Sequence, residues 1–374
     1  MKKRILFLIS DTGGGHRAAA EAIDEAIHHL YPDSYETFVE DIWMEHTPWP
    51  VNKLSRVYPW MTGPGVALWK LLWLTTTMFK SHKIIFSGVS PVVQRRITRF
   101  FTEINPDIIV SVHPLMNHVA IKSRDKAGLG RVPFLTIVTD MVNIHPAWIC
   151  PKVTFCAVPT EAARQLAIKF GMLPEKVMVT GQPVSLKFAS MSDDKARLRQ
   201  KLGLQVNRKT ILLVSGGEGF GPVFEISRAI ARTAPQVQMV VVTGRNSALK
   251  RKLDQVHWEI PTKILEFVNN MPELMGAADI FVTKAGPGSI SEAFIAKLPI
   301  IVFGYIPGQE TGNVTYIQEH QAGLLSEDPI EIARLILDLF SADIACLQQM
   351  TRNAAALARP EASLTIAQKV CELV

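Results

Sequence analysis

A run of glycines followed by a histidine is the first feature of this sequence that could carry chemistry. The apolar residues 5–9 predict a buried strand, and the alanine-rich segment after His16 predicts a helix. Gly13, Gly14 and Gly15 lie between them, where glycine permits a sharp turn and lets a ligand approach the backbone at a helix start. The spacing matches neither G-x-G-x-x-G nor a P-loop. His16 is therefore a candidate reaction centre.

Polar side chains also follow two other predicted strands of the first half. His113 follows a strand at 107–112, and Asp140 follows a strand at 133–139, with His145 a few residues later. Open parallel sheets bind ligands at the carboxyl ends of their strands. These three residues therefore join His16 as candidates, each with a purely structural role as the alternative.

The order of the predicted elements indicates two α/β domains. The chain has 374 residues, of which 48% are hydrophobic and 20% charged, which fits a globular protein larger than one compact core. Apolar strands alternate with helices in both halves, so each half is expected to hold a parallel sheet covered on both faces. A charged stretch at 190–209 separates them. We expect domains at 1–188 and 189–345, followed by C-terminal helices at 346–374.

Charge and cysteine content narrow the partners and the compartment. The formal net charge of +6 favours anionic partners, either nucleotide phosphates or an acidic membrane surface. The four cysteines form no C-x-x-C pair, so they suit a reducing compartment and offer no zinc site. The apolar run after the basic N-terminus is too short for a signal peptide. We expect a cytoplasmic protein.

A tryptophan-rich segment at 43–79 interrupts the α/β pattern and holds five of the seven tryptophans. Its apolar stretch 66–74 is shorter than the ~20 residues that span a bilayer. One interpretation is a helix buried in a core. The other is a membrane-interface element, because tryptophan favours the headgroup level and basic side chains are drawn to anionic lipid. The candidate lipid contacts are Trp60, Trp69 and Trp73, with basic residues beyond them at Lys80, Lys83, Arg95, Arg96 and Arg99.

The second half repeats the pattern of strand, glycine turn and helix. One glycine-rich turn, 216–221, follows a strand at 211–215, and another, 286–288, follows a strand at 279–284. A helix that begins near Ser289 would present free N–H groups suited to a diphosphate. Glu292 would then lie in the first helical turn, where its carboxylate can accept hydrogen bonds from two sugar hydroxyls.

Four ordered motifs, at 13–17, 139–146, 284–288 and 304–310, together resemble the monogalactosyldiacylglycerol synthase family. More broadly, the chain is similar to diacylglycerol glycosyltransferases related to the peptidoglycan glycosyltransferase that makes lipid II. The resemblance implies the GT-B fold, in which two Rossmann-like domains with parallel sheets face across a cleft. It also implies that the C-terminal helices pack back toward the N-terminal domain.

The resemblance also implies roles for individual residues. His16 would deprotonate the acceptor hydroxyl, and we expect Asp140 to orient it. His145 would lie on the acceptor side with the three candidate tryptophans. Plant members carry an arginine at the position of Ser185, so Lys187, Arg245 or another cation would have to replace it. The residues expected to bind the donor are Gly14, Gly15, Gly217, Glu218, Arg245, Phe267, Val268, Met271, Gly286, Pro287, Gly288, Ser289, Ile290, Glu292, Gln309 and Glu310.

The expected activity is an inverting transfer of a hexose, with galactose favoured, from a UDP-sugar to the free hydroxyl of 1,2-diacylglycerol. Histidine, with a usual pKa of ~6.5, can act as the base, and helix N-termini would stabilise the departing UDP. We expect no metal, no cofactor and no nucleic-acid partner, and a peripheral position on the cytoplasmic face of an anionic membrane.

Other functions stay open at this point. A UDP-glucose donor or a polyprenyl-linked acceptor would keep the same second domain. A UDP-sugar epimerase would not need a membrane-binding segment, and a non-catalytic nucleotide-sugar-binding protein would not need His16. The sequence does not determine the oligomeric state.

Overall fold

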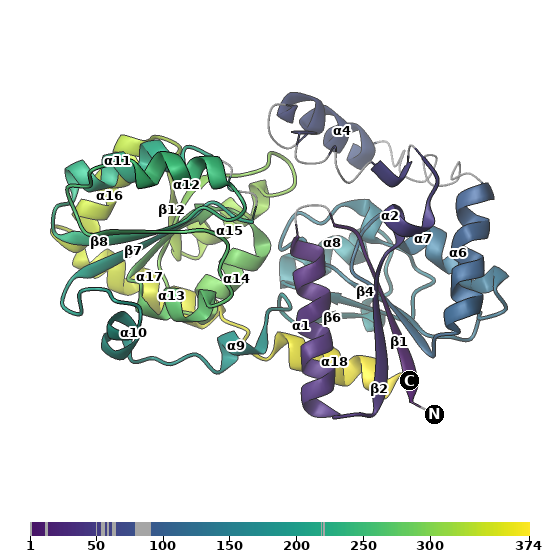
Figure 1. The fold of residues 1–374 in the computed structure, drawn as a ribbon. Coiled ribbons are helices and arrows are strands. Elements are labelled where there is room, and N and C mark those ends of the chain that lie inside the picture. Colours follow the sequence, from purple (N-terminus) through teal and green to yellow (C-terminus); the bar gives the residue numbers. More distant parts are fainter. Residues whose placement is uncertain are drawn as a thin grey trace. The chain divides into compact units, whose positions relative to one another are not determined.

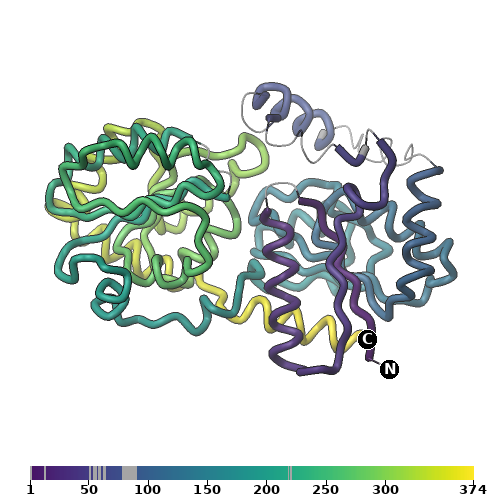
Figure 2. The backbone as a smooth tube through the Cα atoms, viewed as in Figure 1, coloured from purple at the N-terminus to yellow at the C-terminus, as the bar shows by residue number. Residues whose placement is uncertain are grey.

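The computed structural model describes residues 2–11, 14–49, 51–53, 57, 60–61, 65–78, 91–217, 219 and 221–374, and it consists of two α/β units (Figure 1). Unit 1 comprises Met1–Leu186, Pro307–Gly312 and Glu361–Val374, and unit 2 comprises Lys187–Ile306 and Asn313–Pro360. The first segment of unit 1 thus ends close to the predicted boundary at 188. The predicted C-terminal segment 346–374 is shared between the units, and both chain ends belong to unit 1 (Figure 2).

Unit 1 is built on a parallel sheet of six strands in the order β2-β1-β3-β4-β5-β6. Alternate residues of its first strand enter different cores: Leu6 and Leu8 face one, and Ile5, Phe7 and Ile9 face the other. This explains the unbroken apolar run, because both faces of the sheet are covered. The strands are β1 (Lys3–Ile9), β2 (Tyr35–Asp41), β3 (Ile108–Ser111), β4 (Phe134–Ile137), β5 (Phe155–Val158) and β6 (Val177–Val179).

Helices cover both faces of this sheet (Figure 1). One core contains apolar residues of α1 and α18, and the other contains residues of α6, α7 and α8. The helices and 3-10 turns of unit 1 are α1 (Gly15–Leu30), α2 (Ile42–His46), η1 (Val51–Lys53), α4 (Val66–Met78), α6 (Pro91–Ile104), α7 (Asn117–Lys126), η2 (Pro146–Trp148), α8 (Glu161–Lys169), η3 (Pro174–Lys176) and α18 (Ala362–Glu372).

Helix α4 occupies the tryptophan-rich segment and is not part of a core. Its leucines Leu68, Leu71, Leu72 and Leu74 are 40–57% exposed, so the interpretation as a buried core helix is wrong. Within the described residues, no helix has the length and apolarity needed to cross a membrane. Of the basic residues after it, Lys80 and Lys83 lie outside the described residues, and Arg95, Arg96 and Arg99 lie on the exposed side of α6.

Unit 2 contains a second parallel sheet of six strands, in the order β12-β11-β10-β7-β8-β9. The strands are β7 (Lys209–Val214), β8 (Val237–Val242), β9 (Thr262–Leu265), β10 (Ile280–Lys284), β11 (Ile300–Gly304) and β12 (Gly323–Leu325). The helices are α9 (Leu186–Ala189), which begins at the boundary, α10 (Lys195–Lys201), α11 (Val223–Thr233), α12 (Ser247–Asp254), α13 (Met271–Ala277), α14 (Pro287–Ile295), α15 (Thr311–Glu319), whose first two residues are grouped with unit 1, α16 (Pro329–Phe340) and α17 (Ile344–Leu357).

Helix α14 begins earlier than predicted. Gly286 is its N-cap and Pro287 its first residue, because proline has a backbone angle suited to the first helical position, where no N–H is needed. The predicted start near Ser289 is therefore wrong, and Glu292 lies in the second turn rather than the first. The N–H of Ile290 already bonds Gly286 O at 3.0 Å. A ligand can reach only the N–H groups before it.

Candidate active site

Each sheet has one point where the strand order reverses. In unit 1 this point lies between β1 and β3, and in unit 2 it lies between β7 and β10. Ligands of open parallel sheets bind outside the carboxyl ends of the strands at such points. His16 follows β1 and His113 follows β3, while the glycine turn 216–217 follows β7 and Gly286 follows β10. The two strand–turn–helix motifs and their partners thus lie at the positions where the topology favours ligands.

His16 lies in the first turn of α1, next to residues of the neighbouring strand ends. Its Nδ1 is 3.0 Å from Thr139 Oγ1, and its ring meets the edge of the His113 ring with centroids 4.7 Å apart. The indole of Trp148 lies further off, with centroids 6.0 Å apart. Gly14, the N-cap of α1, has φ +79°, which favours glycine. Gly14 and Gly15 are exposed, so the backbone here is open to a ligand.

The surroundings of His16 keep its imidazole neutral. Burial lowers the pKa of His16 to about 4, against the smaller raising effects of a hydrogen bond with the Val112 backbone and of the Asp11 charge. Burial, and then the neighbouring His16, lower the pKa of His113 well below its usual value. Asp11 is the carboxylate that acts on His16, although Arg17 holds both of its oxygens at 2.8 Å. At neutral pH the imidazole of His16 is therefore unprotonated, as a general base must be before it takes up a proton.

Asp140 does not orient His16, contrary to the sequence prediction. Its Oδ2 accepts from Trp148 Nε1 at 2.7 Å, and its Oδ1 accepts from Gln309 Nε2 at 3.3 Å. Burial raises the pKa of Asp140 to about 6, and these hydrogen bonds oppose the rise. Thr139, its neighbour in the chain, is the residue that contacts His16. Sequence reasoning noted Thr139 within a motif but assigned it no role, and Trp148 carried no signal.

His145 lies beside the inner face of α4. Its Nδ1 accepts from Ala147 N at 3.1 Å, so in the neutral ring Nε2 carries the proton, and this nitrogen is 3.0 Å from Thr76 Oγ1. The Trp73 indole meets the His145 ring with centroids 4.9 Å apart. Trp69 and Trp73 are half-buried and 5.9 Å apart, whereas Trp60 is 53% exposed. The predicted acceptor-side residues therefore lie in unit 1, and three of the four pack near one another.

The glycine turn after β7 in unit 2 lies next to two cations. A Cβ placed on Gly217 would lie 3.7 Å from Arg245 Nη1, and one on Gly216 would lie 3.4 Å from Lys284 Cε and 3.9 Å from its Nζ. Within the described part of the chain, Lys284 has no carboxylate partner. Sequence reasoning did not assign Lys284 a role, although it ends β10 directly before the Gly-Pro-Gly turn. The other residue predicted here, Glu218, lies outside the described residues.

Arg245 also contacts the predicted base-binding segment. Its guanidinium lies over the Phe267 ring, 4.9 Å from the centroid, and Phe267 is 55% exposed. Val268 is half-buried, and the half-buried Met271 is the first residue of α13. The structure therefore brings together Gly217, Arg245 and Phe267, which sequence reasoning had assigned separately to one nucleotide.

The predicted diphosphate and sugar contacts around α14 are only partly accessible. No Cβ clash restricts Gly286 or Gly288, and Gly288 and Ser289 hold the N–H groups before Ile290. Ile290 does not fit its predicted role, because its side chain is buried and its N–H is used within the helix. Glu292 is half-buried, and burial raises its pKa to about 8. Its carboxylate has no hydrogen-bond partner within the described residues.

Gln309 and Glu310 belong to the segment Pro307–Gly312, which is grouped with unit 1. Glu310 is buried, and its charge contributes to the raised pKa of Asp140. The carbonyl of the adjacent Gly308 accepts from Asn143 Nδ2 at 3.3 Å. The predicted hexose contacts are thus held beside Asp140 rather than grouped with the α14 turn.

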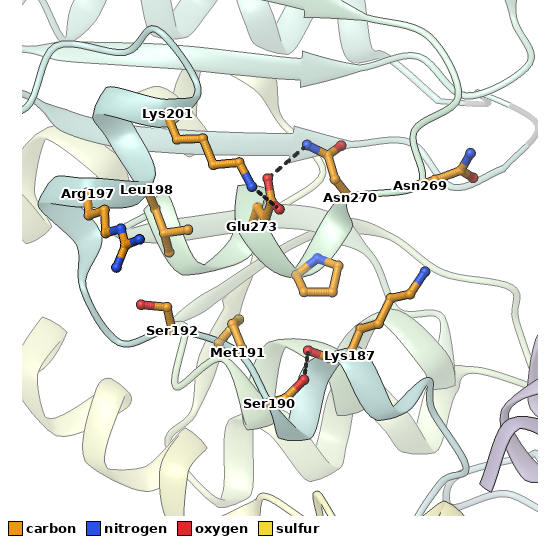
Figure 3. Close-up of a pocket in the computed structure, with 11 residues that line it drawn as sticks. Lys187, Ser190, Met191, Ser192, Arg197, Leu198, Lys201, Asn269, Asn270 and Glu273 are labelled. Atoms are coloured by element: carbon orange, nitrogen blue, oxygen red, sulfur yellow. Dashed lines mark hydrogen bonds and ion pairs between the residues drawn. The ribbon is translucent and has the colours of Figure 1, made fainter. Parts of the chain in front are cut away.

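A pocket of about 560 Å³ lies in unit 2 beside the base-binding segment (Figure 3). Asn269 and Asn270 form one wall and α9 and α10 form another, and Lys201 Nζ pairs with Glu273 at 2.7 Å. Lys187, one of the cations considered in place of the missing arginine, lines this pocket, whereas Arg245 lies at the glycine turn. Ser185, which takes the arginine's position, instead donates to Glu25 Oε2 at 2.9 Å.

The described residues contain one group that could hold a metal ion, formed by Glu40, Glu45 and His46. Burial and the neighbouring Glu40 raise the pKa of Glu45. None of the three is a predicted site residue. The expectation that the reaction needs no metal stays a prediction.

Comparison with known proteins identifies the relatives of both halves. The family described as monogalactosyldiacylglycerol (MGDG) synthase matches residues 16–184, and the glycosyltransferase family 28 C-terminal domain matches residues 210–366. A probable MGDG synthase of Glycine max is 41% identical over 380 residues, covering 100% of this chain and 72% of the relative. MGDG synthase 1 of Arabidopsis thaliana is 40% identical, covering 100% of this chain and 71% of the relative.

Solved structures of similar fold include Acinetobacter baumannii MurG, with a TM-score of 0.62 at 13% identity over 99% of both chains. Anabaena HepE in complex with UDP-glucose gives a TM-score of 0.57 at 16% identity, covering 99% of this chain and 98% of that one. At these identities the likeness concerns the fold alone, and it confirms the predicted GT-B fold.

These comparisons correct one prediction and confirm another. The relatives from Glycine max and Arabidopsis thaliana are both named chloroplastic, which contradicts the predicted cytoplasmic location. The resemblance inferred from the motifs is confirmed, because the identity is about 40% over the whole chain. The chain is a GT-B glycosyltransferase, and it belongs to the monogalactosyldiacylglycerol synthase family.

Proposed function

We propose that this enzyme transfers galactose from UDP-galactose to the free hydroxyl of 1,2-diacylglycerol by a single inverting displacement. The observation that carries the proposal is a neutral histidine at the strand-order reversal of unit 1, in the unit that also exposes an apolar helix. The names of the relatives support galactose and diacylglycerol. The UDP-glucose bound to the structural neighbour HepE supports a UDP-sugar donor.

His16 is the proposed general base. The acceptor oxygen forms a bond to the anomeric carbon while its proton passes to His16, and the bond from that carbon to the diphosphate oxygen breaks with inversion. Such a base contributes ~10²–10⁴-fold in rate. Burial opposes the positive charge that develops on the imidazole, and the Asp11 carboxylate supports it. Thr139 holds the ring in place through Nδ1.

The cations of unit 2 are proposed to bind the diphosphate. Lys284 and Arg245 flank the turn of Gly216 and Gly217, and the N–H groups at the start of α14 add a positive dipole. Fixed positive charge at the leaving group stabilises it as it departs. Arg245 over Phe267 also supports a site for the base, so Arg245 is our candidate for the cation that replaces the missing family arginine.

The acceptor is proposed to arrive from a lipid surface at α4. A helix with four exposed leucines leaves apolar area in water, and burying such area gains ~25 cal/mol per Å². Exposed Arg95 and Arg96 on α6 favour an anionic surface. Diacylglycerol needs only to present its hydroxyl, because its acyl chains stay in the bilayer.

A donor-by-acceptor assay tests the proposal. Purified protein is mixed with UDP-galactose or UDP-glucose and with vesicles that contain diacylglycerol or a polyprenyl-linked sugar, with and without a chelator. We expect a monogalactosyldiacylglycerol whose anomeric configuration, read by NMR, is the reverse of that in the donor. Formation of a 2-epimer or of free galactose without glycolipid would contradict the proposal. A retained configuration, or loss of turnover with the chelator, would contradict the mechanism.

A further inference from the structure

Helix α4 has two different apolar faces. The leucines described above face outward, while Trp69, Trp73 and Thr76 recur at spacings of three and four residues and are half-buried. The inner face contacts other parts of unit 1, as in the 3.0 Å contact between Thr76 Oγ1 and His145 Nε2. An interface helix needs only its outer face to bind lipid, so the inner aromatic face requires a separate explanation.

Trp73 packs directly against the backbone of Gly308. A Cβ on Gly308 would lie 2.5 Å from Trp73 Cδ1, 2.8 Å from Cγ and 3.0 Å from Nε1. Gly308 also has φ +87°, a conformation that other residues rarely adopt. Only glycine therefore lets the indole approach this part of the chain so closely.

The backbone held by Trp73 leads directly to the candidate site. Gly308 O accepts from Asn143 Nδ2 at 3.3 Å, and Gly308 N donates to Thr311 Oγ1 at 2.9 Å. The next residue, Gln309, donates to Asp140 at 3.3 Å. The contact between Trp73 and Gly308 therefore connects α4 directly to the segment Pro307–Gly312, which carries both predicted hexose contacts.

We propose that Trp73 is a positioning residue that holds the segment Pro307–Gly312 for the donor hexose, and that Thr76 supports Trp73 by fixing the inner face of α4 on His145. Through them, α4 links binding of a lipid surface to recognition of the sugar. The inference rests on the proposed function, which supplies the hexose and the lipid. A surface that fixes the outer face of α4 also fixes Trp73 over Gly308, so lipid and hexose should strengthen each other's binding reciprocally.

Calorimetry with UDP and with UDP-galactose tests the positioning role without any acceptor. The ratio of the two affinities reports what the hexose adds. Trp73→Ala should lower the affinity for UDP-galactose by about tenfold or more toward that of UDP, because a lost hydrogen bond to a charged group costs ~1.5–3 kcal/mol and the released segment carries both predicted hexose contacts. The affinity for UDP itself should not change. Trp73→Phe, which keeps a ring over Gly308, should restore most of the ratio, and Thr76→Val should lower it less.

Trp49→Ala is the matched control, because Trp49 is 78% exposed in the same tryptophan-rich segment. It should leave the ratio as in the wild type. An unchanged ratio in a folded Trp73→Ala variant, or an equal loss of UDP affinity, would overturn the positioning role. If the wild type itself binds UDP-galactose no more tightly than UDP and makes no glycolipid, the proposed function has failed instead.

Vesicles of phosphatidylcholine and phosphatidylglycerol, without diacylglycerol, test the lipid link. They should raise the ratio in the wild type but not in Trp73→Ala. The double variant Leu71→Ala/Leu74→Ala should lose vesicle binding in a sedimentation assay, and its ratio should then not respond to vesicles. A ratio that rises equally in all three proteins, or in none, would show that α4 does not couple the two sites.

Discussion

The glycine turns at the strand-order reversals of the two units have the same topology but different electrostatics. In unit 1 the turn leads into His16, which burial keeps neutral, and the adjacent Arg17 is paired with Asp11. In unit 2 the turn at Gly216 and Gly217 lies beside Arg245 and Lys284. The fold supplies the turn in both cases. The side chains that flank the turn decide whether the site provides a general base or binds an anion.

The largest expected effect comes from removing the base. His16→Ala should lower kcat by ~10²–10⁴-fold, because proton removal is needed only in the transition state. Its affinity for UDP, measured by calorimetry, should stay close to that of the wild type. If a saturating concentration of donor restored the rate, His16 would bind the diphosphate instead of acting as the base, and the two turns would then have the same role.

Removing a cation from the other turn should have the complementary effect. Lys284→Met should weaken UDP binding by ~10–100-fold, because a hydrogen bond to a charged group is worth ~1.5–3 kcal/mol. Uridine, which lacks the diphosphate, should bind as well as before. Lys250→Met serves as a control, since Lys250 is paired with Asp254 on α12. Equal losses for UDP and uridine would show that Lys284 supports the fold rather than the phosphates.

Glu292 is expected to contribute less to donor binding. Glu292→Gln keeps the shape and one acceptor oxygen, so the donor KM should rise about tenfold if the carboxylate binds ribose. The 2′-deoxy analogue of the donor should show a smaller difference between wild type and variant. A donor KM like that of the wild type would remove Glu292 from the site.

The smallest effects concern stability, and they have opposite signs in the two units. The raised pKa of Glu292, about 8 against a usual 4.5, means that the folded state binds its proton more tightly, so stability falls as pH rises through this window. The lowered pKa of His16, about 4 against 6.5, means that stability falls as pH drops from 6.5 to 4. In the absence of ligand, the melting temperature of Glu292→Gln should therefore rise relative to that of the wild type at alkaline pH. The melting temperature of His16→Gln should rise relative to that of the wild type at acidic pH. Parallel curves for wild type and variants would contradict both assignments.

The sequence predicted the sheets well because strands buried on both faces read as continuous apolar runs. The sequence also predicted that His16 follows an open turn, because three successive glycines favour a turn between a strand and a helix. The sequence could not tell whether Thr139 or Asp140 contacts His16. Successive side chains of an extended chain point to different sides, so only one of the two can face His16, and the residue pattern does not show which. Only the structure shows that both oxygens of Asp140 accept hydrogen bonds from Trp148 and Gln309 rather than from His16.

One alternative left open by the sequence and two further errors have identifiable causes. The stretch that forms α4 is apolar nearly all round, so its periodicity could not tell a buried helix from one with an exposed face. Pro287 is compatible with either a turn or a first helical residue, which displaced the predicted start of α14. The compartment was misjudged because cysteine content reports redox conditions and not the organelle.

The packing of α18 against α1 has a consequence for synthesis of the chain. Ile366, Ala367 and Val370 complete the core that Ala20 and Ile23 begin, and residues of unit 2 are translated in between. Domains usually fold from the N-terminus as they emerge from the ribosome. Here the second unit can complete its folding first. The first unit then exposes the alanine and isoleucine residues of α1 until α18 has emerged from the ribosome. Chaperones should therefore contact these residues throughout most of translation.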